Sequence, residues 1–146
     1  MEKSINPNLH YNYKPTDLKA MNPVTLAFIG DSVFSDYIRR YLLATGIQNV
    51  NHLTKKSISF VNASGQATAV RALQPILSEE ENDLVRRGRN SHSHVPKNAK
   101  AIDYRYATGF EALLGYLSLS GQTDRLEFLI SQGIQIIEEK FHEFKK

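Results

Sequence analysis

The sequence predicts an all-α fold, and two kinds of observation support that class. No segment alternates apolar and polar residues with the period of two that is typical of a half-buried strand. Near the C-terminus, apolar residues recur instead at the spacing of one helix face, at Leu126, Leu129, Ile130, Ile134, Ile137 and Phe141. Signals for helix starts and stops divide the rest of the chain into further helical stretches. We therefore expect a helical bundle.

Two regions are expected along the chain of 146 residues. Residues 1–20 should form an irregular N-terminal segment, because Pro7 and Pro15 interrupt any helix there. Residues 21–146 should form one domain, since a chain of this length with 41% hydrophobic residues suits one compact core.

The expected helices follow from the residues at their ends. Asn22 before Pro23 is an N-cap followed by proline at the first helical position. Ser78 and Glu81 fit a capping box, and Thr123 fits the cap of the last helix. The helices are expected at about 22–44, 50–73 (broken near 55–57 or at Gly65), 78–88, 102–119 and 123–144.

The composition excludes several classes of protein. The chain has no cysteine, so disulfides and thiolate metal sites are excluded, as suits a reducing cytoplasm. No stretch approaches the roughly 18 apolar residues of a membrane span, and residues 1–20 lack the apolar block of a signal peptide. We expect a cytoplasmic protein that does not enter a membrane. The net charge of +3, with a pI near 9.1, hints mildly at an anionic partner.

Two helical stretches each carry an acid near a glycine in apolar surroundings. Asp31 follows Gly30, and Glu111 lies four residues before Gly115 on the same helix face. Small residues let two helix backbones approach closely, which would bring Asp31 and Glu111 together. Two close carboxylates repel unless a proton or cation lies between them, and Mg²⁺ suits one or two carboxylates with several waters. A shared metal site is one interpretation, and two solvated or salt-bridged acids are the other.

Five cations and no acid lie in the polar stretch 86–100, which we expect to be largely a flexible loop: Arg86, Arg87, Arg89, Lys97 and Lys100. Arginine and lysine bind phosphate oxygens, and double-stranded RNA is read mainly through its phosphates and 2′-hydroxyls. The alternative is a solvated surface. His92 and His94 are weak evidence for a metal site, because no third ligand lies near them in the sequence.

Two motifs resemble those of the ribonuclease III catalytic domain. LAFIGDSVFSDYIRRYLL, residues 26–43, resembles its signature helix, and YATGFEALLGYLSL, residues 106–119, resembles its second acidic helix. VRRGRN and PKNA, between the motifs, are similar to the small bacterial branch called Mini-ribonuclease III, which lacks a double-stranded-RNA-binding domain. The resemblance extends from about Leu18 almost to the C-terminus. It implies the helical bundle of that family's endonuclease domain.

The resemblance implies that Asp31 and Glu111 are catalytic and hold the metal, Mg²⁺ with Mn²⁺ as a possible substitute. Larger ribonuclease III enzymes carry two more acids, at the positions of Ala27 and Thr108. The Mini branch shares both losses, which leave the number of metals open. Thr108 could still reach the metal through a water molecule.

The family also implies an assembly. Its signature helices pack across the two-fold axis of a homodimer, which makes Phe28, Ile29 and Phe34 interface candidates. Each of these three residues could equally fill the core of the monomer.

The function implied is that of a Mg²⁺-dependent endoribonuclease. It would cleave double-stranded RNA to leave 5′-phosphates, in maturation of the large-subunit (23S) ribosomal RNA precursor, with any ribosomal-protein helper unknown. The alternative is a non-catalytic RNA-binding or ribosome-associated helical module. The missing acids at Ala27 and Thr108 are the best support for that alternative.

Overall fold

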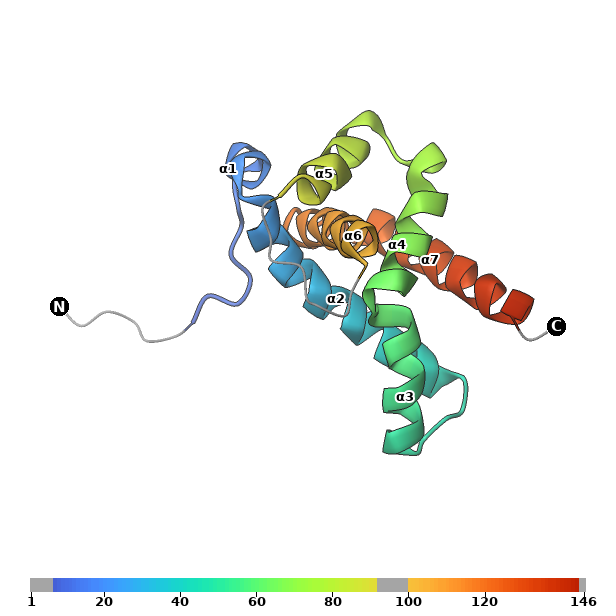
Figure 1. Cartoon of the computed structure of the whole chain (residues 1–146). Helices are drawn as coiled ribbons and strands as arrows, with labels where there is room; N and C mark the ends of the chain where they lie inside the picture. The colour runs from blue at the N-terminus through green and yellow to red at the C-terminus, as the bar shows by residue number, and fades with distance from the viewer. Residues whose placement is uncertain (1–6, 92–99, 145–146) are drawn as a thin grey trace.

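The computed structural model describes residues 7–91 and 100–144, and within these ranges all regular structure is helical (Figure 1). The predicted all-α fold is therefore confirmed. The elements are α1 (Pro15–Ala20), α2 (Pro23–Ala44), α3 (Val50–Val61), α4 (Ala63–Leu73), the 3₁₀ turn η1 (Gln74–Ile76), α5 (Glu79–Arg89), α6 (Ala101–Leu119) and α7 (Thr123–Phe144).

Several helix ends agree with the caps expected from the sequence. The side chain of Asn22 accepts a hydrogen bond from the backbone nitrogen of Val24, and Pro23 begins α2. Ser78 and Glu81 form both bonds of the capping box at the start of α5. Thr123 is the first residue of α7 rather than the residue that caps it.

The break in the stretch 50–73 falls at Asn62, not near 55–57 or at Gly65. Asn62 has an extended backbone, with ψ at 165°, and its side chain accepts a hydrogen bond from the Gly65 nitrogen at 2.7 Å. It ends α3 and caps α4 at once, which makes the break stable. Gly65 permits close packing here, because a Cβ atom would lie 2.6 Å from the carbonyl oxygen of Ser59.

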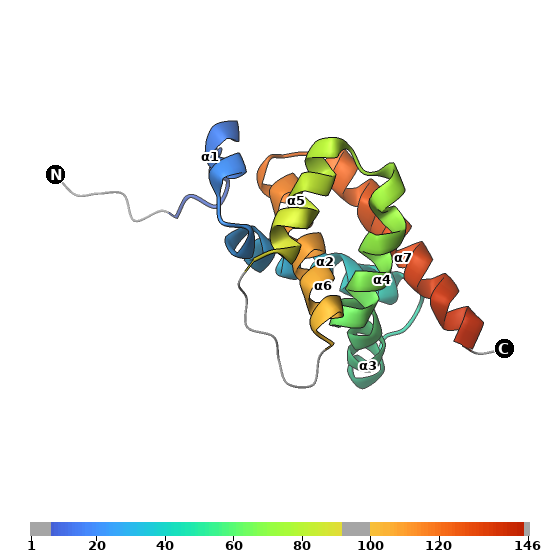
Figure 2. The ribbon, with the colours of Figure 1, turned by 45° about the horizontal axis from the view of Figure 1, so that its top comes forward.

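The N-terminal segment contains a short helix, so the expectation that all of residues 1–20 are irregular is wrong. Pro15 stands in the first turn of α1, where its missing N–H costs nothing. Leu18 anchors α1 in the core, with 1% of its surface exposed. Figure 2 shows α1 at the N-terminal side of the bundle.

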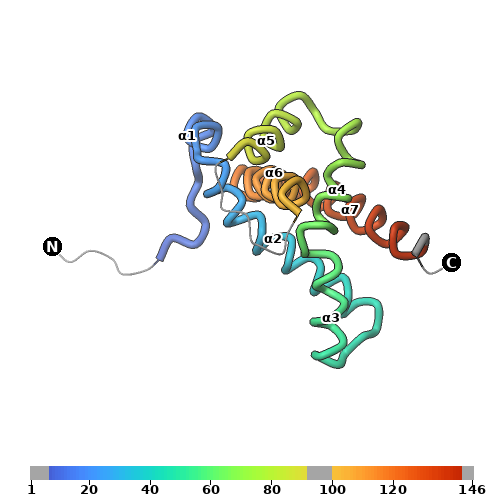
Figure 3. Tube along the Cα trace, viewed as in Figure 1, coloured from blue at the N-terminus to red at the C-terminus, as the bar shows by residue number. Residues whose placement is uncertain are grey.

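Helix α6 is the centre of the bundle and contacts α2, α4, α5 and α7. The tube in Figure 3 shows α2 and α5 on two sides of it, with α3 projecting from the bundle. The side chains of α6 are mostly buried, and Phe110 packs edge-on against Phe34 of α2 with ring centroids 5.4 Å apart. An acid on this helix is consequently held in a fixed, poorly solvated place.

Glycines let α2 and α6 approach closely. A Cβ atom at Gly30 would overlap the carbonyl oxygen of Glu111 and lie 2.6 Å from its carbonyl carbon. A Cβ atom at Gly115 would likewise overlap the carbonyl oxygen of Leu26. The two helices therefore touch through their backbones at both positions.

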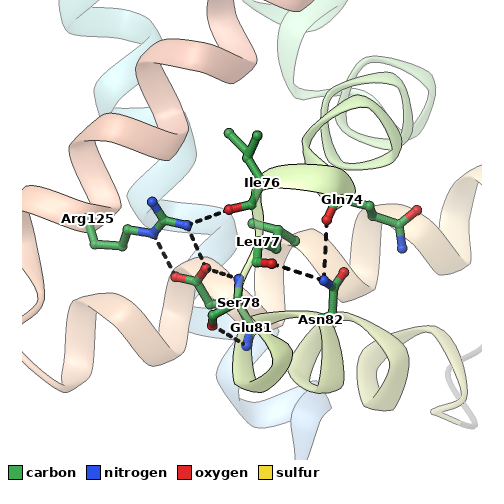
Figure 4. Close-up of polar contacts among 7 residues, drawn as sticks. All are labelled: Gln74, Ile76, Leu77, Ser78, Glu81, Asn82 and Arg125. Carbon is green, nitrogen blue, oxygen red and sulfur yellow. Dashed lines mark hydrogen bonds and ion pairs between the residues drawn. The ribbon is translucent and has the colours of Figure 1, made fainter.

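A polar cluster joins the start of α5 to α7 (Figure 4). Arg125 of α7 donates to both carboxylate oxygens of Glu81, at 2.7 and 2.9 Å, and also to the carbonyl oxygen of Ile76. Glu81 is almost fully buried, and its hydrogen bonds with Arg125 hold the pKa of its carboxyl below the ordinary value. This cluster positions α5 against the bundle. Within the described ranges, no helix is long and apolar enough to span a membrane.

Candidate active site

Asp31 and Glu111 meet where α2 and α6 touch. Both line a surface cavity of about 430 Å³, formed by α2, α6 and the junction of α3 and α4. The predicted close approach of the two helices is thus confirmed, and the backbone that comes close to Gly30 is that of Glu111 in the same chain. The other residues lining the cavity are Val24, Ala27, Phe28, Val61, Ala63, Gln66, Tyr104, Ala107 and Thr108.

The two carboxyl groups have different environments. Asp31 is exposed, whereas Glu111 is largely enclosed. Burial raises the pKa of Glu111 to about 8, and its hydrogen bond with Asp31 and the charge of Asp31 act in the same direction. Glu111 therefore carries a proton at neutral pH in the absence of a cation. A cation between the two groups would take the place of that proton.

Gln66 of α4 is a buried polar residue that also lines the cavity. Its Nε2 donates to Oε2 of Glu111 at 3.3 Å and to the carbonyl oxygen of Val61 at 2.9 Å. This amide favours the charged form of Glu111 and partly opposes the rise in its pKa. Gln66 was not predicted as a site residue. The one sign of it in the sequence is a single amide side chain in a run of small and apolar residues, GQATAV.

The donor set fits a magnesium ion. Carboxylate oxygens are hard ligands, and Mg²⁺ usually takes one or two of them while it keeps several waters. The exposed Asp31 and the open cavity leave room for those waters. Among the residues that the structure describes, no group of three or more histidine, cysteine or acidic side chains could hold a metal. A sparse, water-rich site is therefore the kind that this chain could form.

Two residues that line this cavity are Ala27 and Thr108. They stand at the positions where the resemblance places acids in the larger ribonuclease III enzymes. Thr108 is buried, and its hydroxyl donates to the carbonyl oxygen of Tyr104 at 3.0 Å. That bond uses the hydroxyl proton but leaves an oxygen lone pair to accept from water. The expected link to the metal through water remains a prediction.

Three of the five predicted RNA-binding cations lie in α5. Arg86 and Arg87 fall within the helix expected at 78–88, whereas Arg89, expected in the loop, is the last residue of α5. Arg86 pairs with Asp83 one turn earlier on the exposed face. Arg87 donates to the carbonyl oxygens of Lys19 and Met21, at 3.0 and 3.1 Å. Arg87 therefore fastens the end of α1 to α5 with two of its five N–H donors. Its contact with phosphate remains a prediction.

Arg89 has a different environment. Its guanidinium carbon lies 4.6 Å from the centre of the Tyr106 ring, and Arg71 of α4 lies 4.9 Å from the same ring. Within the described ranges, neither arginine has a carboxylate in salt-bridge distance. The ring thus holds two cations from two helices near the start of α6.

The remaining basic residues divide between described and undescribed parts of the chain. Lys100 is exposed and precedes α6 as its N-cap residue. Lys97, together with the weak histidine pair His92 and His94, lies outside the described residues.

The three interface candidates also divide. Phe28 is 77% exposed and Ile29 is half-buried. Phe34 is fully buried and packs on Phe110, so its assignment to an interface is wrong: it fills the core of the monomer.

Comparison with known proteins identifies the family. Residues 24–122 match the model of the family described as Ribonuclease III domain. A protein named Mini-ribonuclease 3 from Thermoanaerobacter sp. is 50% identical over 82% of this chain and 85% of its own. Another protein named Mini-ribonuclease 3, from Brevibacillus brevis, is 45% identical over 84% of this chain and 92% of its own length.

A solved structure is also similar. A crystal structure of a Fusobacterium nucleatum protein superposes with a TM-score of 0.74 and 28% identity, covering 82% of this chain and 96% of that one. The fold and the relatives thus point to the same family. Members of the ribonuclease III family generally use a divalent metal ion. The chain belongs to the ribonuclease III family, among the Mini-ribonuclease 3 proteins, and is an endoribonuclease.

Proposed function

We propose that this endoribonuclease hydrolyses double-stranded RNA with Mg²⁺ held by Asp31 and Glu111. The observation that carries the proposal is the meeting of these two carboxyl groups in one cavity, where burial and repulsion favour a cation between them. A bound Mg²⁺ would supply Lewis acidity and help to ionise water. Mn²⁺, which also suits carboxylate and water ligands, is expected to substitute.

The reaction follows the pattern implied by the family. The oxygen of water forms a bond to phosphorus, and the bond from phosphorus to the 3′ oxygen breaks. One fragment keeps a 5′-phosphate and the other gains a proton to become a 3′-hydroxyl. Asp31 and Glu111 orient the attack at the mouth of the cavity, with Thr108 accepting from a water molecule.

The enzyme would act as a homodimer, with one site for each strand. Phe28, exposed on the signature helix α2 at the edge of the cavity, supports an interface there. Ile29, the next residue, would join the interface. The paired sites would cut both strands of the duplex.

The cations near the start of α6 would hold the RNA backbone. Arg89 is stacked on Tyr106 without a carboxylate partner among the described residues, and Lys100 stands at the N-terminus of the helix that carries Glu111. Arg86 and Lys97 remain predicted contacts. Double-stranded RNA suits such a surface because its recognition depends on phosphates and shape.

The substrate proposed is the large-subunit (23S) ribosomal RNA precursor, in the cytoplasm, and this part rests on similarity to the Mini branch. Any ribosomal-protein helper is unknown. A test is incubation with a long RNA duplex and with precursor RNA, each with Mg²⁺ or with a chelator. Metal-dependent cleavage to 5′-phosphate ends is expected.

Substitution of the acids tests the residue assignments. Asp31→Asn and Glu111→Gln keep the shapes of the side chains but remove the charges that would hold the metal. The loss of several kcal/mol of transition-state stabilisation should lower the rate by several orders of magnitude. Near wild-type cleavage by either variant in saturating Mg²⁺ would exclude that residue as a ligand. Duplex binding by the wild-type chain without cleavage in Mg²⁺ would favour the RNA-binding module instead.

A further inference from the structure

Gln66 is one of three buried polar side chains among the described residues, with 2% of its surface exposed. Gln66 belongs to α4 and lies 45 residues before Glu111 in the sequence, yet its amide donates to Oε2 of Glu111. The bond therefore joins separate helices inside the cavity. A side chain in this place can control where the Glu111 carboxylate lies.

The amide is itself held by the junction of α3 and α4. Its second hydrogen bond runs to the carbonyl oxygen of Val61, the last residue of α3. The backbone nitrogen of Gln66 donates to the carbonyl oxygen of Asn62, and the Asn62 side chain caps the same turn. The backbone of Gln66 and the amide at the tip of its side chain are thus both hydrogen-bonded to the turn between α3 and α4.

The other atom of the amide has no evident structural use. Oε1 of Gln66 is buried without a hydrogen-bond partner among the described residues. A buried polar atom in that state lowers the stability of the fold. This cost offsets the gain from the bond to the Val61 carbonyl oxygen, so structure alone gives a glutamine little net advantage here.

We propose that Gln66 is a positioning residue, which holds one oxygen of Glu111 so that the other faces a metal ion shared with Asp31. The inference rests on the proposed function, because it requires a metal at Asp31 and Glu111. The hydrogen bond from the buried amide fixes the orientation of the Glu111 carboxylate before the ion binds. Partners of this kind typically change metal affinity by about 10–100-fold when they are removed.

The test is Gln66→Met, which keeps the length of the side chain and removes both polar atoms. Binding of Mn²⁺ alone, without RNA, is measured by calorimetric titration and by the electron paramagnetic resonance of the free ion. The dissociation constant for Mn²⁺ should rise about tenfold or more. Urea unfolding of the metal-free variant should still show a cooperative transition near the wild-type midpoint, because removal of the unpaired Oε1 offsets the loss of the bond to the Val61 carbonyl oxygen.

The matched control is Asn82→Leu, which removes another internal amide. Nδ2 of Asn82 donates to the carbonyl oxygens of Gln74 and Leu77, far from the cavity (Figure 4). This variant should lose stability and keep the wild-type affinity for Mn²⁺. A second variant, Gln66→Leu, repeats the test with a different apolar shape.

The outcomes separate this inference from the proposed function. If wild-type protein binds Mn²⁺ and Asp31→Asn does not, while both Gln66 variants bind as tightly as wild type, only the role of Gln66 is overturned. If wild-type protein binds no Mn²⁺, both proposals are overturned. Failure of both Gln66 variants to fold would also overturn the inference, since Gln66 would then be needed for structure.

Discussion

Gly30 lies against the peptide of Glu111, so that α2 and α6 touch there through their backbones. Asp31, which follows Gly30, and the Glu111 side chain then face the same cavity. The separation of the two carboxyl groups is thereby set by backbone contact, which is stiffer than contact between side chains.

Gly30→Ala should weaken the fold and the site together. Its methyl group would overlap the Glu111 carbonyl oxygen, and the helices must separate to admit it, at a cost of about 3 kcal/mol for such overpacking. Urea unfolding measures the stability, and cleavage of duplex RNA measures the activity.

Gly133→Ala is the control for that substitution. Its Cβ atom would lie 3.5 Å from Ala69, an ordinary contact, and alanine favours a helix over glycine by up to about 1 kcal/mol. Stability should therefore rise in this variant of α7. Equal effects of the two substitutions would show that helix propensity, not close packing, governs both positions.

The stability of the metal-free protein should depend on pH through Glu111. Its pKa is about 8 in the fold, against an ordinary value of 4.5, so the folded state binds the proton more tightly than the unfolded state. This contribution is complete below about pH 4.5 and is lost as the pH rises through about 8. Between pH 4.5 and 9, the free energy of unfolding measured in urea should therefore fall in the wild-type protein. The Glu111→Gln variant should lack this fall.

Other groups titrate in the same range, so the quantity compared is the difference between wild type and Glu111→Gln at each pH. Saturating Mg²⁺ should flatten the wild-type curve, because the ion replaces the proton. Parallel curves in the metal-free state would contradict the raised pKa.

RNA binding should depend on salt through the cations at the Tyr106 ring. If Arg89 contacts a phosphate, Arg89→Ala should lower the slope of log affinity against log salt by roughly 1 for all duplex sequences. Arg71→Ala should act in the same way, since both guanidinium groups lie on one ring. Binding is measured in Ca²⁺ to prevent cleavage.

Arg40→Ala removes the same charge from a residue that is already paired with Asp36 on α2, and it should leave the slope unchanged. An unchanged slope in both Arg71→Ala and Arg89→Ala would place the RNA elsewhere.

Arg87→Ala should lower stability, because the carbonyl oxygens of Lys19 and Met21 lose their donor.

Phe28→Glu should convert a homodimer into a monomer. Phe28 is 77% exposed, so the substitution leaves the core intact but places a charge at the proposed interface. Sedimentation velocity measures the assembly. Val50→Glu, at a residue 72% exposed on α3, should remain dimeric. A stable wild-type monomer that cleaves duplex RNA would contradict the proposed assembly.

Local features of this molecule were accessible to sequence reasoning. Asn22 and Ser78 cap helices with bonds to residues two or three positions away, so the sequence alone contains both partners. The meeting of Asp31 and Glu111 was also predictable, because glycine beside an acid on each helix indicates close packing. These features depend on spacing within a helix or on the size of one residue.

Features that depend on the partner helix were not accessible. Arg87 and Arg89 are two residues apart in a basic stretch, yet one binds carbonyl oxygens of the chain and the other stacks on a tyrosine. Phe28 and Phe34 share one motif, but only the packed helices show which one is exposed. Gln66 bonds to Glu111 of α6, which is 45 residues away in the sequence, so the local pattern around Gln66 does not reveal its role.

The backbone contact between α2 and α6 restricts how the enzyme can be redesigned. Gly30 and Gly115 admit no larger residue without moving a helix, and that movement would displace Asp31 and Glu111, the proposed metal ligands. Ala27 and Thr108 line the open cavity instead, so longer side chains there have space to enter. An engineer who seeks a different metal preference or cutting rate should therefore build libraries at positions 27 and 108, and keep positions 30 and 115 constant.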